Sequence, residues 1–142
     1  MEYFITADPI EKSACACLIL GTFEDGELAP SAKKIDQSTH GLLGRLLKRD
    51  EFKAKPGDTL LLNHVPDSPI ERILLTGLGK KKQLNSKAYR KALAAAIKSL
   101  KQTRAKDAVC ALTEVDVGER DLEWKARQIV EVFEDGLYTF TQ

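Results

Sequence analysis

The residues best suited to chemistry in this 142-residue sequence are bases crowded into one stretch. Positions 80–106 hold ten lysines and arginines and no acid, whereas positions 107–142 hold nine acids and three bases. Three interpretations stay open for this surface: a solvated helix face, a contact with an acidic face of another subunit, or a site for nucleic-acid phosphates. Among the bases, the candidate residues for a DNA or subunit contact are Lys80, Lys81, Lys82, Lys87, Arg90, Lys91, Lys98, Lys101 and Arg104; Lys106 is the tenth base.

A glycine pair precedes this stretch, in Gly77-Leu78-Gly79-Lys80. Backbone N–H groups of such a loop can hold a phosphate group, helped by the start of a following helix. The dinucleotide pattern G-x-G-x-x-G is incomplete because Lys82 occupies its last glycine position, and the spacing G-x-x-x-x-G-K-[ST] is absent. The alternative is a chain reversal that needs small residues.

Thiols and imidazoles are scarce, with Cys15, Cys17, Cys110, His40 and His64. An odd number of cysteines argues against a disulfide framework, and C-x-C without a second pair is a poor zinc signal. No nucleophile–base couple is visible locally. We therefore expect buried, inert thiols and histidines that lie at the surface or at the end of a strand.

Carboxylates beside predicted turns or strand ends also lack a partner carboxylate, lysine or histidine at a recognisable spacing. These residues are Asp8, Asp58, Asp67, Asp107 and Asp116. A second group, Glu119, Asp121 and Glu123, lies at a helix start, where the helix dipole favours negative charge. The sequence thus predicts no catalytic residue and no metal ligand in this chain.

Composition limits the remaining classes of protein. With 43% apolar residues, 30% charged residues and a net charge of +1, the chain is typical of one globular domain, and no strongly basic arm or acidic tail dominates it. Its apolar runs are too short to span a bilayer, and its N-terminus shows no signal peptide. We therefore expect a cytoplasmic protein.

Hydrophobic periodicity predicts the elements that position these residues. Strands are expected over 3–6, 14–23, 59–65, 72–78 and 108–113, and helices over 31–49, 86–103 and 119–137. Ser31 and Asn85 are the expected N-caps, and Gly41 and Gly44 weaken the first helix. This order predicts an α/β fold, a three-layer α/β/α sandwich around a mixed sheet, formed by a single domain over 1–142.

With the elements in place, the chain resembles the N-terminal domain of the leucyl aminopeptidase (cytosol aminopeptidase) family, in its bacterial branch. The resemblance rests on an ordered set of segments rather than on one motif. They are Lys55-Pro-Gly-Asp-Thr-Leu-Leu-Leu62, Glu71-Arg-Ile-Leu-Leu-Thr-Gly-Leu-Gly-Lys80, Tyr89-Arg-Lys91, Ala108-Val-Cys-Ala-Leu-Thr-Glu114, Trp124-Lys-Ala-Arg-Gln128 and Leu137-Tyr-Thr-Phe-Thr-Gln142.

The resemblance implies a macro-domain-like sandwich that carries no chemistry itself. In the family, a C-terminal domain binds two divalent ions (Mn, Zn or Mg) and releases N-terminal amino acids from peptides. The family signature Asn-Thr-Asp-Ala-Glu-Gly-Arg is absent here, so we expect this chain alone to be inactive and to bind no cofactor. Its implied partners are its own catalytic domain, other subunits of a homo-hexamer, and DNA, which some bacterial members bind; no membrane is implied.

Two alternatives remain from the residues. A stand-alone nucleic-acid binding module would use the basic stretch. A nucleotide or ADP-ribose binding module would use the macro-like order and the loop at Gly77–Gly79.

Overall fold

One mixed sheet forms the centre of the computed structural model, which describes residues 14–49, 52–66 and 68–141. Its strands are β1 (Leu18–Thr22), β2 (Thr59–Leu62), β3 (Ile73–Gly77) and β4 (Val109–Cys110), in the spatial order β2-β3-β1-β4. β1 runs parallel to β3 and β4, whereas β2 is antiparallel to β3. The carboxyl ends of β1, β3 and β4 therefore meet at one edge of the sheet.

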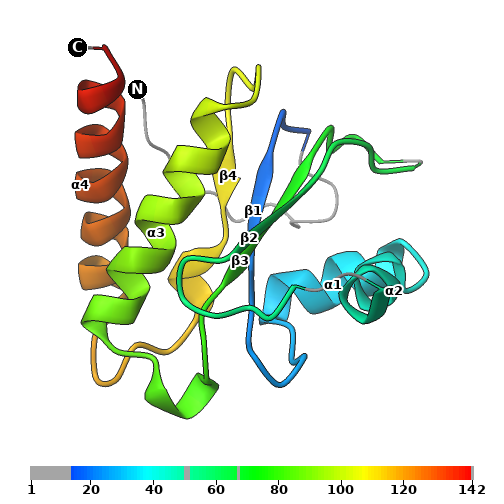
Figure 1. Cartoon of the computed structure of the whole chain (residues 1–142), viewed down its shortest axis with the longest axis horizontal. Helices are drawn as coiled ribbons and strands as arrows, with labels where there is room; N and C mark the ends of the chain where they lie inside the picture. Colours follow the sequence, from blue (N-terminus) through cyan, green and yellow to red (C-terminus); the bar gives the residue numbers. More distant parts are fainter. Residues whose placement is uncertain (1–13, 50–51, 67, 142) are drawn as a thin grey trace.

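Helices cover both faces of this sheet (Figure 1). Helices α3 (Ser86–Lys101) and α4 (Leu122–Thr141) lie on one side, and α1 (Pro30–Ser38) and α2 (Leu42–Arg49) lie on the other. Two 3-10 turns, η2 (Lys81–Gln83) and η3 (Leu112–Glu114), follow β3 and β4. The predicted three-layer α/β/α sandwich is thus confirmed.

Alternation along the central strand explains the two hydrophobic layers. Cys17, just before β1, and Ile19 belong to the layer beneath α3 and α4, whereas Leu18 and Leu20 belong to the layer beneath α1 and α2. Successive side chains of a strand point to opposite faces, so a strand covered on both sides must be apolar throughout. All five residues of β1 and of β3 are buried.

The single helix predicted over 31–49 is wrong. The chain breaks between α1 and α2 because His40 and Gly41 adopt left-handed conformations, with φ of 57° and 84°. Asp36 stabilises the corner: its carbonyl accepts from the Gly41 N–H at 2.7 Å, and its side chain accepts from the Gly44 N–H at 2.9 Å.

Element boundaries show where local signals decide. Asn85 caps α3 as predicted, since its side chain accepts from the Ala88 N–H at 2.9 Å. Asp121 does the same for Trp124 at 2.8 Å, so α4 begins at Leu122 rather than at 119. The strand predicted over 108–113 shortens to Val109–Cys110 before η3, and that over 59–65 ends at Leu62. The strand predicted over 3–6 lies outside the described residues.

No described helix is both long enough and apolar enough to cross a membrane.

Candidate functional site

The glycine loop after β3 lies at the carboxyl edge, where sheets of this class commonly bind ligands. Its three backbone N–H groups are all used inside the chain. The Gly77 N–H donates to the Asp58 carbonyl at 2.8 Å, that of Leu78 to Thr22 at 2.9 Å, and that of Gly79 to Ala54 at 2.8 Å. None of the three is left to donate to a phosphate.

The backbone of the preceding segment explains why glycine is needed here. A Cβ on Gly77 would lie 2.4 Å from the Lys55 carbonyl oxygen and 2.6 Å from the Ala54 carbonyl carbon. Gly79 has a φ of 79°, and a Cβ there would lie 2.9 Å from the Pro56 ring. The chain-reversal interpretation of Gly77–Gly79 therefore accounts for both glycines.

The start of α1 is a second anion-binding position at the same edge, because its backbone N–H groups point outward from the helix end. It is filled by the Glu114 carboxylate from η3, which accepts from the Ser31 N–H at 2.7 Å and from the Ser31 hydroxyl. Ser31 is not the N-cap that the sequence predicts. It is the second residue of α1, after Pro30, and Glu114 supplies the cap across the fold.

Acids and bases of the neighbouring loops also pair with each other. Lys81 donates to Glu27 at 2.9 Å, and Lys33 approaches the same carboxylate at 3.7 Å. The hydrogen bond to Glu27 raises the pKa of the Lys81 ammonium. Lys81 is therefore paired within the chain, unlike a lysine held open for a ligand.

The remaining predicted contact bases separate into groups along and around α3. Arg90 and Lys101 point toward α4. Arg90 contacts Gln128 and the Glu131 carboxylate, the latter at 3.7 Å, and Lys101 donates to the Gly136 carbonyl at 2.9 Å. The acidic partner of the basic helix is thus, in part, the neighbouring helix of the same chain, which the sequence interpretation missed.

Three lysines of α3 point away from the sheet. Lys87, Lys91 and Lys98 are exposed and lie opposite the buried stripe that includes Tyr89 and Leu93. Helical rise places Lys87 and Lys98 about 16 Å apart along the axis. Within the described part of the chain, no carboxylate pairs with these three side chains. They form the outward lysine row, with Lys80 and Lys82 exposed in the loop before it.

Arg104 lies beyond the other end of α3. Together with Arg72 and Lys106 it lines an open depression of about 430 Å³, which also includes Glu71 and Asp107. The Asp107 carboxylate accepts from the Ala16 N–H at 2.7 Å, and the Arg72 guanidinium donates to the Ala16 carbonyl at 3.2 Å. The predicted basic stretch is consequently no single surface.

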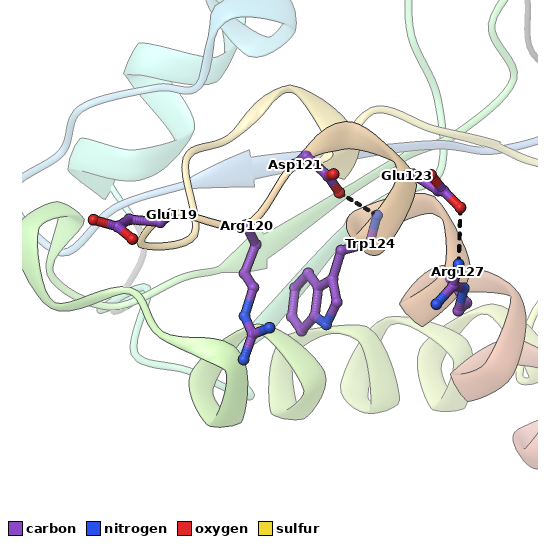
Figure 2. Close-up of a pocket in the computed structure, with 6 residues that line it drawn as sticks. All are labelled: Glu119, Arg120, Asp121, Glu123, Trp124 and Arg127. Carbon is purple, nitrogen blue, oxygen red and sulfur yellow. Dashed lines mark hydrogen bonds and ion pairs between the residues drawn. The ribbon is translucent and has the colours of Figure 1, made fainter.

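A second depression, of about 310 Å³, lies at the start of α4 (Figure 2). Arg120 lies over the Trp124 ring at 5.0 Å, Asp121 caps the helix, and Glu123 pairs with Arg127 at 2.9 Å. No serine, cysteine or histidine lines it. Its charges largely stabilise the helix start, as the sequence predicts for this acidic group.

The thiols have the properties of inert residues, with Cys15 and Cys17 buried and Cys110 half-buried. Burial raises the pKa of Cys15 and of Cys17 to about 11, and that of Cys110 to about 12. Such thiols are nearly all protonated at neutral pH and react poorly. His40 and His64 are exposed, and each lies outside the helices and strands of the fold.

Within the described ranges, no three His, Cys, Asp or Glu side chains gather closely enough to hold a metal ion. The family resemblance assigns the two metal ions to another domain and not to these residues.

Comparison with known proteins places this chain among peptidase sequences. Residues 19–142 match the cytosol aminopeptidase family, N-terminal domain. Probable cytosol aminopeptidases of Photobacterium profundum and Vibrio parahaemolyticus are each 42% identical over all 142 residues. The chain spans 28% of the length of each of these relatives.

Solved structures share the fold. The macrodomain of Mycobacterium tuberculosis DarG aligns with a TM-score of 0.73 at 12% identity, covering 92% of this chain and 88% of that one. A mutant of tomato leucine aminopeptidase aligns with a TM-score of 0.65 at 22% identity, covering 88% of this chain and 26% of that one. At these identities the likeness is evidence for the fold alone.

Proposed function

This chain belongs to the cytosol aminopeptidase family because it matches that family's N-terminal domain, and from that premise we propose that it is the non-catalytic part of a cytoplasmic metallo-aminopeptidase. In this proposal residues 1–142 form one domain. The longer protein releases N-terminal amino acids from peptides, using two divalent ions bound in another domain.

The observation that carries the proposal is the internal use of the carboxyl edge. At this edge the loop amides bind backbone carbonyls and the start of α1 binds Glu114. A fold that fills its customary ligand positions with its own groups is suited to support rather than to catalysis. The same observation weighs against the ADP-ribose alternative, because a diphosphate would have to displace these partners.

The test is hydrolysis of a leucyl-anilide substrate by the purified 142-residue chain with added manganese, zinc or magnesium. We expect no turnover above the metal alone, together with a cooperative unfolding transition that shows the chain is folded. Turnover that co-purifies with the folded chain would refute the proposal.

A second role, binding of nucleic-acid phosphates, is favoured by the outward lysine row. Lys87, Lys91 and Lys98 are exposed and lack an internal carboxylate partner within the described ranges. We propose that this row, with Lys80 and Lys82, follows a phosphate backbone. Arg90 and Lys101, also named by the sequence, contribute less because they already contact α4.

A salt titration of DNA binding tests this second role. Binding should weaken as salt rises, and Lys87→Glu with Lys98→Glu should weaken it for any DNA sequence. The matched control is Lys34→Glu with Lys48→Glu, which changes the net charge by the same four units at exposed positions of α1 and α2. Binding that is absent at low salt, or equally weakened by the control, would remove this role.

Assembly with other subunits, including a homo-hexamer, belongs to the same proposal for the longer protein. It is supported by family membership and by the share of the relatives that lies outside the matched domain, since this chain spans 28% of their length.

A further inference from the structure

The outer edge of β2 is an unpaired hydrogen-bonding surface. Hydrogen bonds on either side of β3 fix which residues face which neighbour. The Leu78 N–H donates to the carbonyl of Thr22, the last residue of β1, whereas the Gly77 N–H donates to the carbonyl of Asp58, just before β2. In the β2–β3 register, Leu60 and Leu62 therefore bond to β3, while Thr59 and Leu61 direct their N–H and C=O groups outward.

No described residue covers these outward groups. Within the ranges 14–49, 52–66 and 68–141, no backbone or side-chain group bonds to the main chain of Thr59 or Leu61. The strand sequence Thr-Leu-Leu-Leu is uncharged, mostly apolar and only half-buried. Exposed edges of this kind readily add another strand.

We propose that β2 pairs antiparallel with β2 of a second copy of this chain, with Leu61 on the two-fold axis. In that register Leu61 faces Leu61, and Leu60 faces Leu62 on the side of α1 and α2. Thr59 then faces Asn63, and Asp58 faces the exposed His64 of the other copy. An acid opposite an imidazole, at both ends of a leucine pair, is the complementarity that selects a second copy as the partner.

Both neighbouring two-fold registers are poorer: with Leu62 facing Leu62, His64 lies opposite Leu60 and Asp58 lies opposite Pro66. Shifting the copies so that Leu60 faces Leu60 sets the Asp58 carboxylate opposite Leu62 and leaves His64 without an acid. The proposed pairing continues the sheet across both copies and uses only backbone and side chains of 58–64. It is independent of aminopeptidase function, so either proposal can fail alone.

Amide hydrogen exchange of the full chain, measured by NMR at a low and a high protein concentration, tests the pairing. We expect the amides of Leu60 and Leu62 to be protected at both concentrations and those of Thr59 and Leu61 only at the high one. Protection of Thr59 and Leu61 at both concentrations would mean that the edge is covered within one chain. Protection at neither would mean that it stays open; each of these results overturns the proposal.

Cysteine cross-linking tests the register separately. Leu61→Cys should form a covalent dimer under mild oxidation, because paired residues lie about 5.5 Å apart between Cα atoms. Leu60→Cys is the matched control, since its opposite residue is Leu62, and it should cross-link at least tenfold more slowly. Equal rates, or no cross-link in Leu61→Cys, would overturn the register. The wild-type chain reports any background from its own cysteines.

Discussion

The carboxylate of Glu114 accepts a hydrogen bond at 2.7 Å from the backbone N–H of Ser31, 83 positions earlier in the chain. The bond joins η3 to the start of α1 at the same edge of the sheet, and it sets a negative charge where the helix dipole favours one. Because the N-cap residue Ala29 offers no side-chain acceptor, the hydrogen bond from Ser31 to Glu114 replaces the missing side-chain cap.

Replacing the carboxylate tests this cap. We expect Glu114→Gln to lower the free energy of unfolding by about 1–2 kcal/mol, since the helix start loses its charged acceptor. Urea unfolding followed by circular dichroism measures it. Glu119→Gln makes the same chemical change at an exposed site and should stay within about 0.5 kcal/mol of the wild type. Equal losses in the two variants would argue against the cap.

Two Gly→Ala changes, one in the glycine loop and one in α2, should change the free energy of unfolding in opposite directions. Gly77→Ala should destabilise by at least about 2 kcal/mol, because its Cβ would meet backbone atoms of Ala54 and Lys55 that cannot rotate away. Gly44→Ala, inside α2, should be neutral or stabilise by up to about 1 kcal/mol, because its Cβ meets only the Asp36 carboxylate, at 3.6 Å. Urea unfolding midpoints compare the two variants. A Gly77→Ala variant with an unchanged midpoint would contradict the close approach of the Ala54 and Lys55 backbone to Gly77.

Two buried threonines in adjacent strands form another matched pair. The Thr76 hydroxyl is buried without a hydrogen-bond partner within the described structure, whereas that of Thr22 reaches the Glu27 carbonyl at 3.4 Å. Thr76→Val should therefore stabilise the chain by about 0.5–1 kcal/mol, and Thr22→Val should not. Thermal unfolding measures both. A loss of stability in Thr76→Val would imply a hydrogen bond that these contacts lack.

Thiol protonation makes stability depend on pH in one direction. Burial raises the pKa of Cys15 and Cys17 from 9.0 to about 11, so the folded state holds protons that the unfolded state has lost. Their contribution is complete below about pH 9 and declines as pH rises toward 11. The urea midpoint should fall across that window, and it should fall less in the double variant Cys15→Ala with Cys17→Ala. An identical slope in both proteins would contradict this origin.

Local signals in the sequence predicted most of the layers. The capping residue Asn85 predicts the start of α3, and the apolar runs around Leu18–Leu20 and Ile73–Leu75 predict two strands buried on both faces. The weak point predicted at Gly41 lies at the break between α1 and α2, but the break itself was missed because it also needs His40, a non-glycine residue, at positive φ. Helical periodicity continues across that corner and hides it.

The candidate site was predicted less well, because its interactions connect distant segments. Charge counting found the basic stretch but not that Arg90 and Lys101 contact α4, since side-chain direction follows from packing. The amino-acid sequence of the loop at Gly77–Gly79 is compatible with both a phosphate site and a chain reversal. Only the position of Ala54 and Lys55, more than 20 residues earlier in the chain, distinguishes these two interpretations.

The central claim is that this chain supports an aminopeptidase without containing its chemistry. The most direct measurement joins residues 1–142 to the part of the Photobacterium profundum relative that lies beyond the matched 28%, and assays leucyl-anilide hydrolysis with manganese. We predict activity close to that of the intact relative from the chimera, and none from the 142-residue chain alone. Turnover by the chain alone, or a folded chimera that is inactive, would contradict the account.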